Sequence, residues 1–291
     1  MRDALVADFA AIPDFTVLTL DDVPRTHFPE LFANHVRAAD GVILIAPEID
    51  GELESIARFT ESIGGRLLGC SANQIAAASN KLALAFWWRD HGVPTPETIS
   101  GDAWYSGMWP FPVVVKPICG AGSFGVTSCD TEGEVAAALA RLGPKRSIIQ
   151  RRVPGLAASI AFLCGRHQRI GLVPTSQRLA TDFAYLGGEL PLPGNLGNRA
   201  KALARQALKS SGRGYIGVDL VLGDDPSGSQ DYAIEINPRL TTSYLGQRAA
   251  IHANVAALWW NVVHGNPIQP YRLRRGAWHF RADGRIERTA E

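Results

Sequence analysis

A glycine-rich segment between two strand-like runs constrains the fold of this chain more than any other feature. Residues 120–125 read Gly-Ala-Gly-Ser-Phe-Gly, which fits a GxGxxG pattern. In a dinucleotide-binding fold a helix begins directly after such a loop, whereas here Val126-Thr127-Ser128 follows, which is typical of a strand. Phe111–Lys116, before the loop, is a predicted buried strand. The loop therefore connects two strands of a predicted hairpin, where its backbone N–H groups can lie over phosphate oxygens.

Lys116 is the basic residue best placed to act with this loop. It follows Val113-Val114-Val115 and precedes Pro117. Because burying a lysine is costly unless it meets an anion, we predict that Lys116 binds nucleotide phosphates; a strand-end lysine that reaches solvent is the alternative. Lys81, near a predicted helix start, is either a second phosphate contact or an exposed lysine. The chain has no GxxxxGK[ST] motif, which excludes a Walker A loop.

Three polar residues lie within two apolar strands near the end of the sequence. Asp219 lies within Gly217–Val221, and Glu235 and Asn237 alternate, so the latter two point to the same face of their strand. If the two strands pair as a hairpin, these oxygen ligands converge into a site suited to Mg²⁺. A polar stripe on a half-buried sheet is the alternative. Arg239, which follows directly, favours the metal site because it could meet a phosphate during transfer.

Two further stretches have the composition of loops near a site. They supply the candidate substrate contacts Tyr185, Gly187, Gly188, Thr241, Thr242 and Ser243. No convincing Ser/His/Asp or Cys/His set accompanies them, so we expect no protein nucleophile. The pairs Trp87-Trp88 and Trp259-Trp260 fall within predicted helices, where we expect core and edge packing rather than stacking platforms.

Composition and charge exclude several classes of protein. The chain has 291 residues, 46% of them hydrophobic, and a net charge of +1, enough for one compound domain or two smaller ones. The near-neutral charge gives no support for a nucleic-acid or membrane partner. The four cysteines form no CxxC pair and the seven histidines form no HExxH. We therefore expect neither a zinc site nor a disulfide framework. We expect a cytoplasmic location, because no signal peptide or transmembrane segment is evident.

The predicted elements divide the chain into a small α/β part and two mixed α+β parts. In the first part, residues 1–12 and Glu52–Ile63 are predicted helices, and a βαβ rhythm predicts a small parallel sheet. Its predicted strands are Val17–Leu20, Val42–Ala46 and Arg66–Gly69. The later predicted helices are Ser71–His91 (with a Ser71/Gln74 capping box and a break at Ser79-Asn80), 131–142, Leu196–Ser211 and Ser243–Val263. The later predicted strands are Ser147–Val153, Ala158–Leu163 and Arg169–Thr175, with hairpins over Tyr215–Ile236 and Trp278–Glu287.

The order and spacing of these segments resemble the ATP-grasp superfamily from about residue 66 to residue 263. The segments that carry the resemblance are Lys81, Phe111–Pro117, the glycine-rich loop, Ile148–Gly155, Gly217–Asp219 and Glu235–Arg239. The resemblance implies an ATP-grasp fold, with ATP between two α+β subdomains. It implies a pre-ATP-grasp domain at 1–75, subdomains at 76–149 and 150–270, and a C-terminal tail or hairpin at 271–291.

The resemblance also implies a role for each matching residue. The residues implied for ATP are Lys81, Lys116, Gly120, Gly122, Ser123, Gly125, and the hinge residues Gln150, Arg151 and Val153. Asp219, Glu235 and Asn237 would bind one or two Mg²⁺ (or Mn²⁺), and Lys116 and Arg239 would be catalytic. Many relatives hold the ribose with an acidic residue soon after the hinge, but residues 155–159 contain no carboxylate.

Residues 235–244 and 185–188 are most similar to the tyramine–glutamate ligases, which make part of methanofuran and methylofuran. This implies a ligase that activates the γ-carboxylate of glutamate with ATP and joins it to tyramine or a tyrosine-like amine. The alternatives are another peptide or polyglutamate ligase, a non-catalytic ATP-binding protein and a dehydrogenase. The sequence is also compatible with a homodimeric enzyme. Such relatives carry a strand before their first helix, whereas this chain starts at the helix, so we expect a shortened N-terminal domain.

Overall fold

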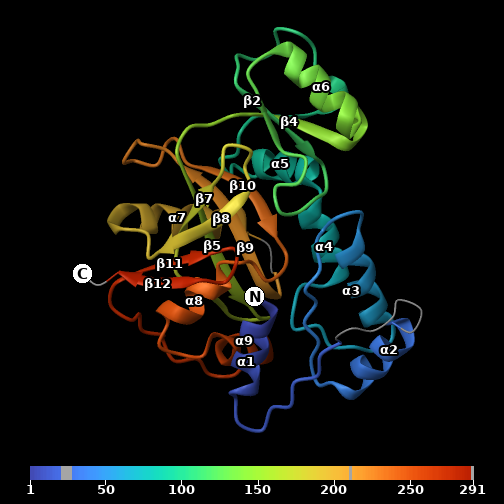
Figure 1. Cartoon of the computed structure of the whole chain (residues 1–291), viewed down its shortest axis with the longest axis vertical. Coiled ribbons are helices and arrows are strands. Elements are labelled where there is room, and N and C mark those ends of the chain that lie inside the picture. Colours follow the sequence, from blue (N-terminus) through green and yellow to red (C-terminus); the bar gives the residue numbers. More distant parts are fainter. Residues whose placement is uncertain (21–27, 210–211, 290–291) are drawn as a thin grey trace.

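The computed structural model describes residues 1–20, 28–209 and 212–289. Its helices are α1 (Arg2–Ala10), α2 (Phe28–Ala38), α3 (Glu52–Ser62), α4 (Ala72–Ser79), α5 (Lys81–Asp90), α6 (Glu132–Leu142), α7 (Gly194–Ala207), α8 (Tyr244–Ala250) and α9 (Val255–His264). A small sheet with α6 lies at one end, a larger sheet fills the centre, and α2, α3 and α4 lie along one side (Figure 1). Within the described part, no helix is long and apolar enough to cross a membrane.

The small sheet presents the glycine-rich loop. It consists of β1 (Thr98–Ser100), β4 (Ser147–Arg151), β2 (Val113–Pro117) and β3 (Thr127–Cys129) in that order, all antiparallel. Val113 pairs with Cys129 and Val115 with Thr127, so the loop joins two strands of a hairpin, as predicted. The valines alternate into a core beneath α6. The charged Lys116 is consequently placed near the end of β2, beside the loop.

The large sheet carries the acidic residues. Its strands are β5 (Leu156–Cys164), β6 (Arg169–Gly171), β7 (Thr175–Leu179), β8 (Tyr185–Leu190), β9 (Gly214–Leu222), β10 (Tyr232–Asn237), β11 (Ala277–Arg281) and β12 (Ile286–Thr289). The order is β10-β9-β5-β7-β8-β11-β12, with β6 on β5, and all pairs are antiparallel. The predicted β9–β10 and β11–β12 hairpins are confirmed. Because β11 pairs with β8, the C-terminal hairpin is part of the large sheet.

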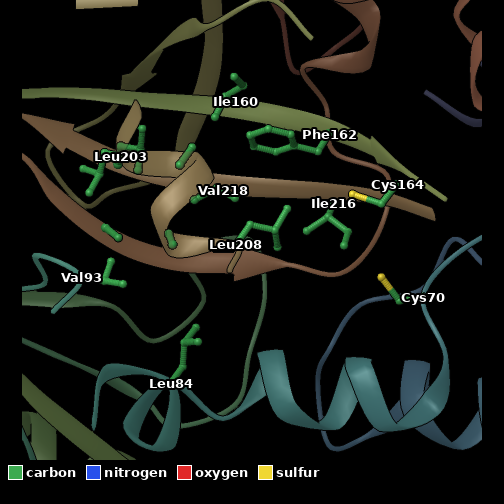
Figure 2. Packing of buried hydrophobic residues seen from close by; sticks show 14 of the residues in the cluster. Cys70, Leu84, Val93, Ile160, Phe162, Cys164, Leu203, Leu208, Ile216 and Val218 are labelled. Carbon is green, nitrogen blue, oxygen red and sulfur yellow. The ribbon is translucent and has the colours of Figure 1, made fainter. Parts of the chain in front are cut away.

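Alternation along the central strands gives the large sheet two apolar faces. Ile160 and Phe162 of β5 pack with Ile216 and Val218 of β9 beneath α7, α4 and α5 (Figure 2). The intervening residues, such as Leu163, pack beneath α1, α8 and α9. The tryptophan expectation holds, because Trp88 and Trp259 are buried in these cores and donate to backbone carbonyls of Ala207 (3.0 Å) and Leu68 (2.9 Å), respectively. Helices therefore cover part of both faces, and the site lies where the strands extend beyond these cores.

The predicted N-terminal parallel sheet is reduced to a single bridge. Val42 bridges Leu67 in parallel, with Val42 N–H donating to the Arg66 carbonyl (2.8 Å). The predicted strand Val17–Leu20 is wrong: no ladder in the described chain includes it, and Leu18 is 52% exposed. A strand is defined by its ladder to a neighbouring strand, and residues 17–20 belong to none of the ladders in the described chain. Helix α2 was not predicted.

Other boundaries also differ from the prediction, two of them because an element is divided. The helix predicted over Ser243–Val263 is two helices, because Ile251 bridges Leu273 and the Asn254 side chain caps α9 by accepting from Ala257 N–H (3.1 Å). The run Arg169–Thr175 is likewise divided between β6 and β7. By contrast, the Ser71/Gln74 capping box and the break between α4 and α5 at Asn80 are confirmed. The break places Lys81 at the first position of α5.

Candidate active site

A cavity of about 470 Å³ lies between the two sheets. Its wall includes most of the predicted site residues: Lys81, Lys116, Gly120, Gly122, Ser123, Gln150, Arg151, Val153, Tyr185, Asp219, Glu235, Asn237, Arg239, Thr241, Thr242 and Ser243. Gly125, Gly187 and Gly188, all within the described chain, lie outside this wall. The small sheet contributes basic and backbone groups, and the large sheet contributes the acidic ones.

Lys116 is held inside the protein rather than in solvent. Only 5% of the residue is exposed, and its Nζ donates to Gln150 Oε1 (2.9 Å), while Gln150 Nε2 donates to Thr98 Oγ1 (2.8 Å). Burial lowers the pKa of Lys116 to about 8, although the negative charge of Glu235 opposes this shift. The strand-end reading of Lys116 as a solvent-exposed lysine is therefore wrong, and an anion in the cavity would stabilise the buried ammonium.

Lys81 links the glycine-rich loop to the acidic residues. From the start of α5, its Nζ donates to the Gly120 carbonyl (2.8 Å) and lies 3.4 Å from Glu235 Oε2. Its side chain is only 11% exposed, so Lys81 is a residue of the cavity and not of the surface. The two lysines thus approach the same carboxylate from different elements.

Asp219 and Glu235 face each other across the β9–β10 pair. Burial, followed by the repulsion of Glu235, raises the pKa of Asp219 to about 7. Burial also acts to raise the pKa of Glu235, but the positive charges of Lys81 and Lys116 outweigh it and lower that pKa. The two carboxylates therefore share a cavity in which only one is readily ionised, and a further cation would allow both to ionise.

The donors present fit a divalent cation such as Mg²⁺. Asn237 Nδ2 and Gln177 Nε2 donate to the two oxygens of Asp219 (2.9 and 3.0 Å), which orients that carboxylate and leaves the amide oxygen of Asn237 for a metal. Among the described residues, no three or more His, Cys, Asp or Glu side chains lie together so that they could hold a metal ion. The third protein oxygen would therefore come from an amide, and water and phosphate oxygens would complete the shell that Mg²⁺ prefers.

Arg239 follows β10 and lies on the cavity wall. Its Nε donates to Glu48 Oε2 (2.7 Å), and its Nη1 donates to the Leu240 carbonyl (3.2 Å). Next to it, Thr241 Oγ1 and Ser243 Oγ lie 2.8 Å apart, and the Tyr215 hydroxyl lies 3.5 Å from Thr241 Oγ1. The cavity thus has a guanidinium and a hydroxyl group adjacent to the acidic residues.

Comparison with known proteins identifies the family to which this chain belongs. A family model described as the ATP-grasp domain matches residues 78–243, and one described as the pre ATP-grasp 3 domain matches residues 2–75. The chain belongs to the ATP-grasp family. Among solved structures, its fold resembles that of an ATP-grasp superfamily protein from Archaeoglobus fulgidus (TM-score 0.68, 24% identity, 93% of this chain and 77% of that one). It also resembles N5-carboxyaminoimidazole ribonucleotide synthetase from Thermus thermophilus (TM-score 0.70, 20% identity, 86% and 68%).

Curated relatives of this ATP-grasp protein are ligases. The tyramine–L-glutamate ligase of Methanocaldococcus fervens is 28% identical over 209 residues, 71% of this chain and 61% of the relative. That of Methanocaldococcus jannaschii is 28% identical over 211 residues, 71% and 58%. The D-alanine–D-alanine ligase of Laribacter hongkongensis is 25% identical over 222 residues, 70% and 71%. The matches to the two tyramine–glutamate ligases span about three fifths of those proteins.

The interpretation of residues 185–188 as a loop is wrong. They belong to β8, where Gly187 pairs with Arg178 of β7 and Arg281 of β11. A Cβ atom on Gly187 would lie 2.1 Å from the Phe280 carbonyl oxygen, and one on Gly188 would lie 2.2 Å from the Ser176 carbonyl oxygen. These glycines therefore allow close strand packing, and only Tyr185 of this stretch reaches the cavity, where burial and the charge of Asp219 raise its pKa.

Several residues of this ATP-grasp cavity were not found from the sequence. Gln177, Phe124 and Phe183 line it, and Glu48 lies behind Arg239. The sequence shows only that an acidic residue closely follows the apolar run 42–46, which does not reveal its partner Arg239. After the predicted hinge, the residues on the wall are Gly155, Ala157 and Ser159, so this part of the wall has a hydroxyl group and no carboxylate.

Proposed function

We propose that this chain is an ATP-dependent ligase that activates a carboxylate as an acyl phosphate and joins it to an amine. The observation that carries the proposal is the opposition of Lys81 and Lys116 to Asp219, Glu235 and Asn237 across one cavity. ATP-grasp proteins use ATP and divalent metals, and the curated relatives that match this chain are carboxylate–amine ligases.

The chemistry proceeds in two displacements. A carboxylate oxygen of the first substrate attacks the γ-phosphorus of ATP and ADP leaves; the amine nitrogen then attacks the acyl carbon, phosphate leaves and the amine loses a proton. Lys81 and Lys116 bind phosphate oxygens, and Arg239 meets the charge on the transferred phosphoryl group. Asp219, Glu235 and Asn237 would hold Mg²⁺ or Mn²⁺, which would supply positive charge to neutralise the phosphate oxygens. The glycine-rich loop excludes water from the intermediate.

We further propose glutamate as the carboxylate substrate and tyramine or a tyrosine-like amine as the acceptor. Support comes from the two tyramine–L-glutamate ligases among the relatives. The similarity to a D-alanine–D-alanine ligase supports a peptide-type ligase as the second candidate. Both candidates need only small-molecule partners.

ADP release by the full chain tests these proposals. The assay contains ATP, Mg²⁺ and glutamate, with tyramine, tyrosine, D-alanine or a second glutamate as the acceptor, and each substrate is also omitted in turn. Release that requires both glutamate and tyramine supports the substrate assignment. ADP release with D-alanine in the absence of glutamate would instead support the peptide-type ligase. ATP binding without substrate-dependent ADP release from any mixture would refute the ligase and indicate a nucleotide-binding protein.

A further inference from the structure

An ion pair connects the N-terminal domain directly to the candidate active site. Glu48 lies between the 42–46 run and α3, and its Oε2 accepts from Arg239 Nε at 2.7 Å, across 191 positions of sequence. Only 4% of Glu48 is exposed, and the Arg239 side chain is 18% exposed. The contact is therefore largely protected from solvent, unlike the exposed pair that Asp50, two residues later, makes with Arg146.

Stability gives a poor account of this buried carboxylate. Desolvating two charges commonly offsets their attraction, and an apolar pair of similar volume is often as stable. The second oxygen, Glu48 Oε1, is buried and has no hydrogen-bond partner among the described residues. A buried acceptor left unpaired is destabilising, so the presence of Glu48 calls for a role beyond holding the domains together.

The geometry around Arg239 indicates that role. A guanidinium has five N–H donors on three nitrogen atoms. In Arg239, Nε donates to Glu48 and Nη1 donates to the Leu240 carbonyl. These two contacts restrain the guanidinium, while Arg239 itself lies on the cavity wall. The flexible arginine side chain is thereby fixed before a substrate arrives, which avoids reorganisation during the reaction.

We propose that Glu48 is a positioning residue, which orients Arg239 for phosphoryl transfer and makes the N-terminal domain part of the active site. The inference rests on the proposed function of Arg239. Because Glu48 also neutralises part of the arginine charge, its loss leaves the attraction for ATP unchanged or stronger. The rate of the chemical step falls, because Arg239 is no longer held in place. A lower kcat with an unchanged or lower KM for ATP is thus the signature of positioning, and a purely structural role would not produce it.

Steady-state kinetics on the full chain test this signature. Glu48→Gln removes the charge but keeps the shape, and Glu48→Asp keeps the charge but withdraws it from Nε. We expect kcat to fall about 10- to 100-fold in both variants, with KM for ATP no higher than in the wild type. Asp50→Asn is the matched control, because it removes an exposed carboxylate from the same loop, and it should keep wild-type kcat. If Glu48→Gln does not fold, the kcat and the KM for ATP of Glu48→Asp alone test the proposal.

A double-mutant cycle shows whether Glu48 acts through Arg239. In an Arg239→Lys background, which lacks the Nε donor, Glu48→Gln should cause no further loss of kcat. An equal loss in both backgrounds, or wild-type kcat in both Glu48 variants, overturns the proposal.

A binding measurement separates this proposal from the proposed function. Calorimetry would compare ADP with Mg²⁺ alone and ADP with Mg²⁺ and aluminium fluoride, a mimic of the transferred phosphoryl group. Glu48→Gln should weaken the aluminium fluoride complex and leave ADP binding unchanged, and this readout needs neither ligase substrate. A wild-type chain that releases no ADP refutes the ligase, yet the binding difference still decides on positioning. Equal binding of aluminium fluoride by variant and wild type overturns positioning alone.

Discussion

At the scale of single residues, the site is a balance of buried charges. Glu235 lies 3.4 Å from the Lys81 ammonium and opposite Asp219. Glu235→Gln would remove the carboxylate that we propose as a metal ligand and that lies close to both lysines, so we expect ADP release to fall at least about 100-fold. Loss of one of two neighbouring negative charges should leave the protein folded, as checked by circular dichroism. Glu189→Gln, at an exposed site on β8, serves as the control, and full activity of Glu235→Gln would contradict the metal site.

Through the proposed phosphate contact of Lys116, we expect ATP binding to depend on pH. The pKa of Lys116 is lowered to about 8 by burial. Without a bound nucleotide, the Lys116 amine is therefore mostly protonated below about pH 8 and increasingly neutral above it. We expect ATP affinity, measured by calorimetry, to weaken from about pH 7.5 to about 9.5 as that charge is lost. Lys116→Met should bind more weakly at every pH and lose this dependence. An equally steep pH dependence in the variant would show that another group titrates.

The residues that could be predicted from the sequence are those that signal locally. Lys116 follows three valines, and Glu235 and Asn237 alternate on one strand, so each pattern fits within a few residues. Glu48 and Gln177 could not be predicted, because their partners lie 191 and 42 positions away. Long-range side-chain contacts depend on how domains pack, which local periodicity does not encode.

At the scale of elements, the glycine-rich loop depends on residues with positive φ. Gly122 (φ +66°) has open space where a Cβ would lie, whereas a Cβ on Gly125 (φ +75°) would lie 3.0 Å from Pro117 Cγ. Gly122→Ala should destabilise by about 1–2 kcal/mol through backbone strain, and Gly125→Ala by more, because crowding is added. Urea unfolding of the pair measures the difference. Equal losses would mean that Pro117 moves without penalty.

The break between α8 and α9 gives a second comparison between elements. Asn254 caps α9, and its Nδ2 also donates to the Asp8 carbonyl of α1 (2.7 Å). Asn80 caps α5 by accepting from Ala83 N–H (3.0 Å). Asn80→Ala should cost about 1 kcal/mol, a usual value for a cap, and Asn254→Ala should cost more in urea unfolding because it also frees α1. A smaller loss for Asn254→Ala would show that the contact with α1 adds no stability.

The same break shows where the pattern in the sequence was insufficient. Residues 243–263 contain no proline and are rich in alanine and apolar residues, which predicts one helix, yet Asn254 could have marked a new N-terminus. The N-terminal strands failed for a different reason. Their runs were apolar enough, but pairing needs a neighbouring strand, and only Val42 and Leu67 meet in the described chain.

At the scale of the whole molecule, the order of the motifs predicted the fold class and a site between two subdomains. It did not predict that the C-terminal hairpin pairs with the large sheet. The β11–β12 hairpin extends the large sheet through β8, and Phe280, 1% exposed, fills the space that Gly188 and Gly246 leave. Ending the chain at Arg275 would remove this hairpin and expose the backbone of β8 as a sheet edge, which favours aggregation. It would also uncover apolar residues beneath α8.

We therefore expect the truncated chain to unfold at a lower temperature and to form larger species, as measured by circular dichroism melting and size-exclusion chromatography. Phe280→Ala is the finer test, because it leaves the edge paired and removes only the buried ring, at about 3–5 kcal/mol. If the missing packing causes the defect, the point variant should melt early without assembling. If the bare edge causes it, only the truncated chain should assemble. A truncated chain with the wild-type melting temperature and elution volume would mean that the sheet is complete at β8.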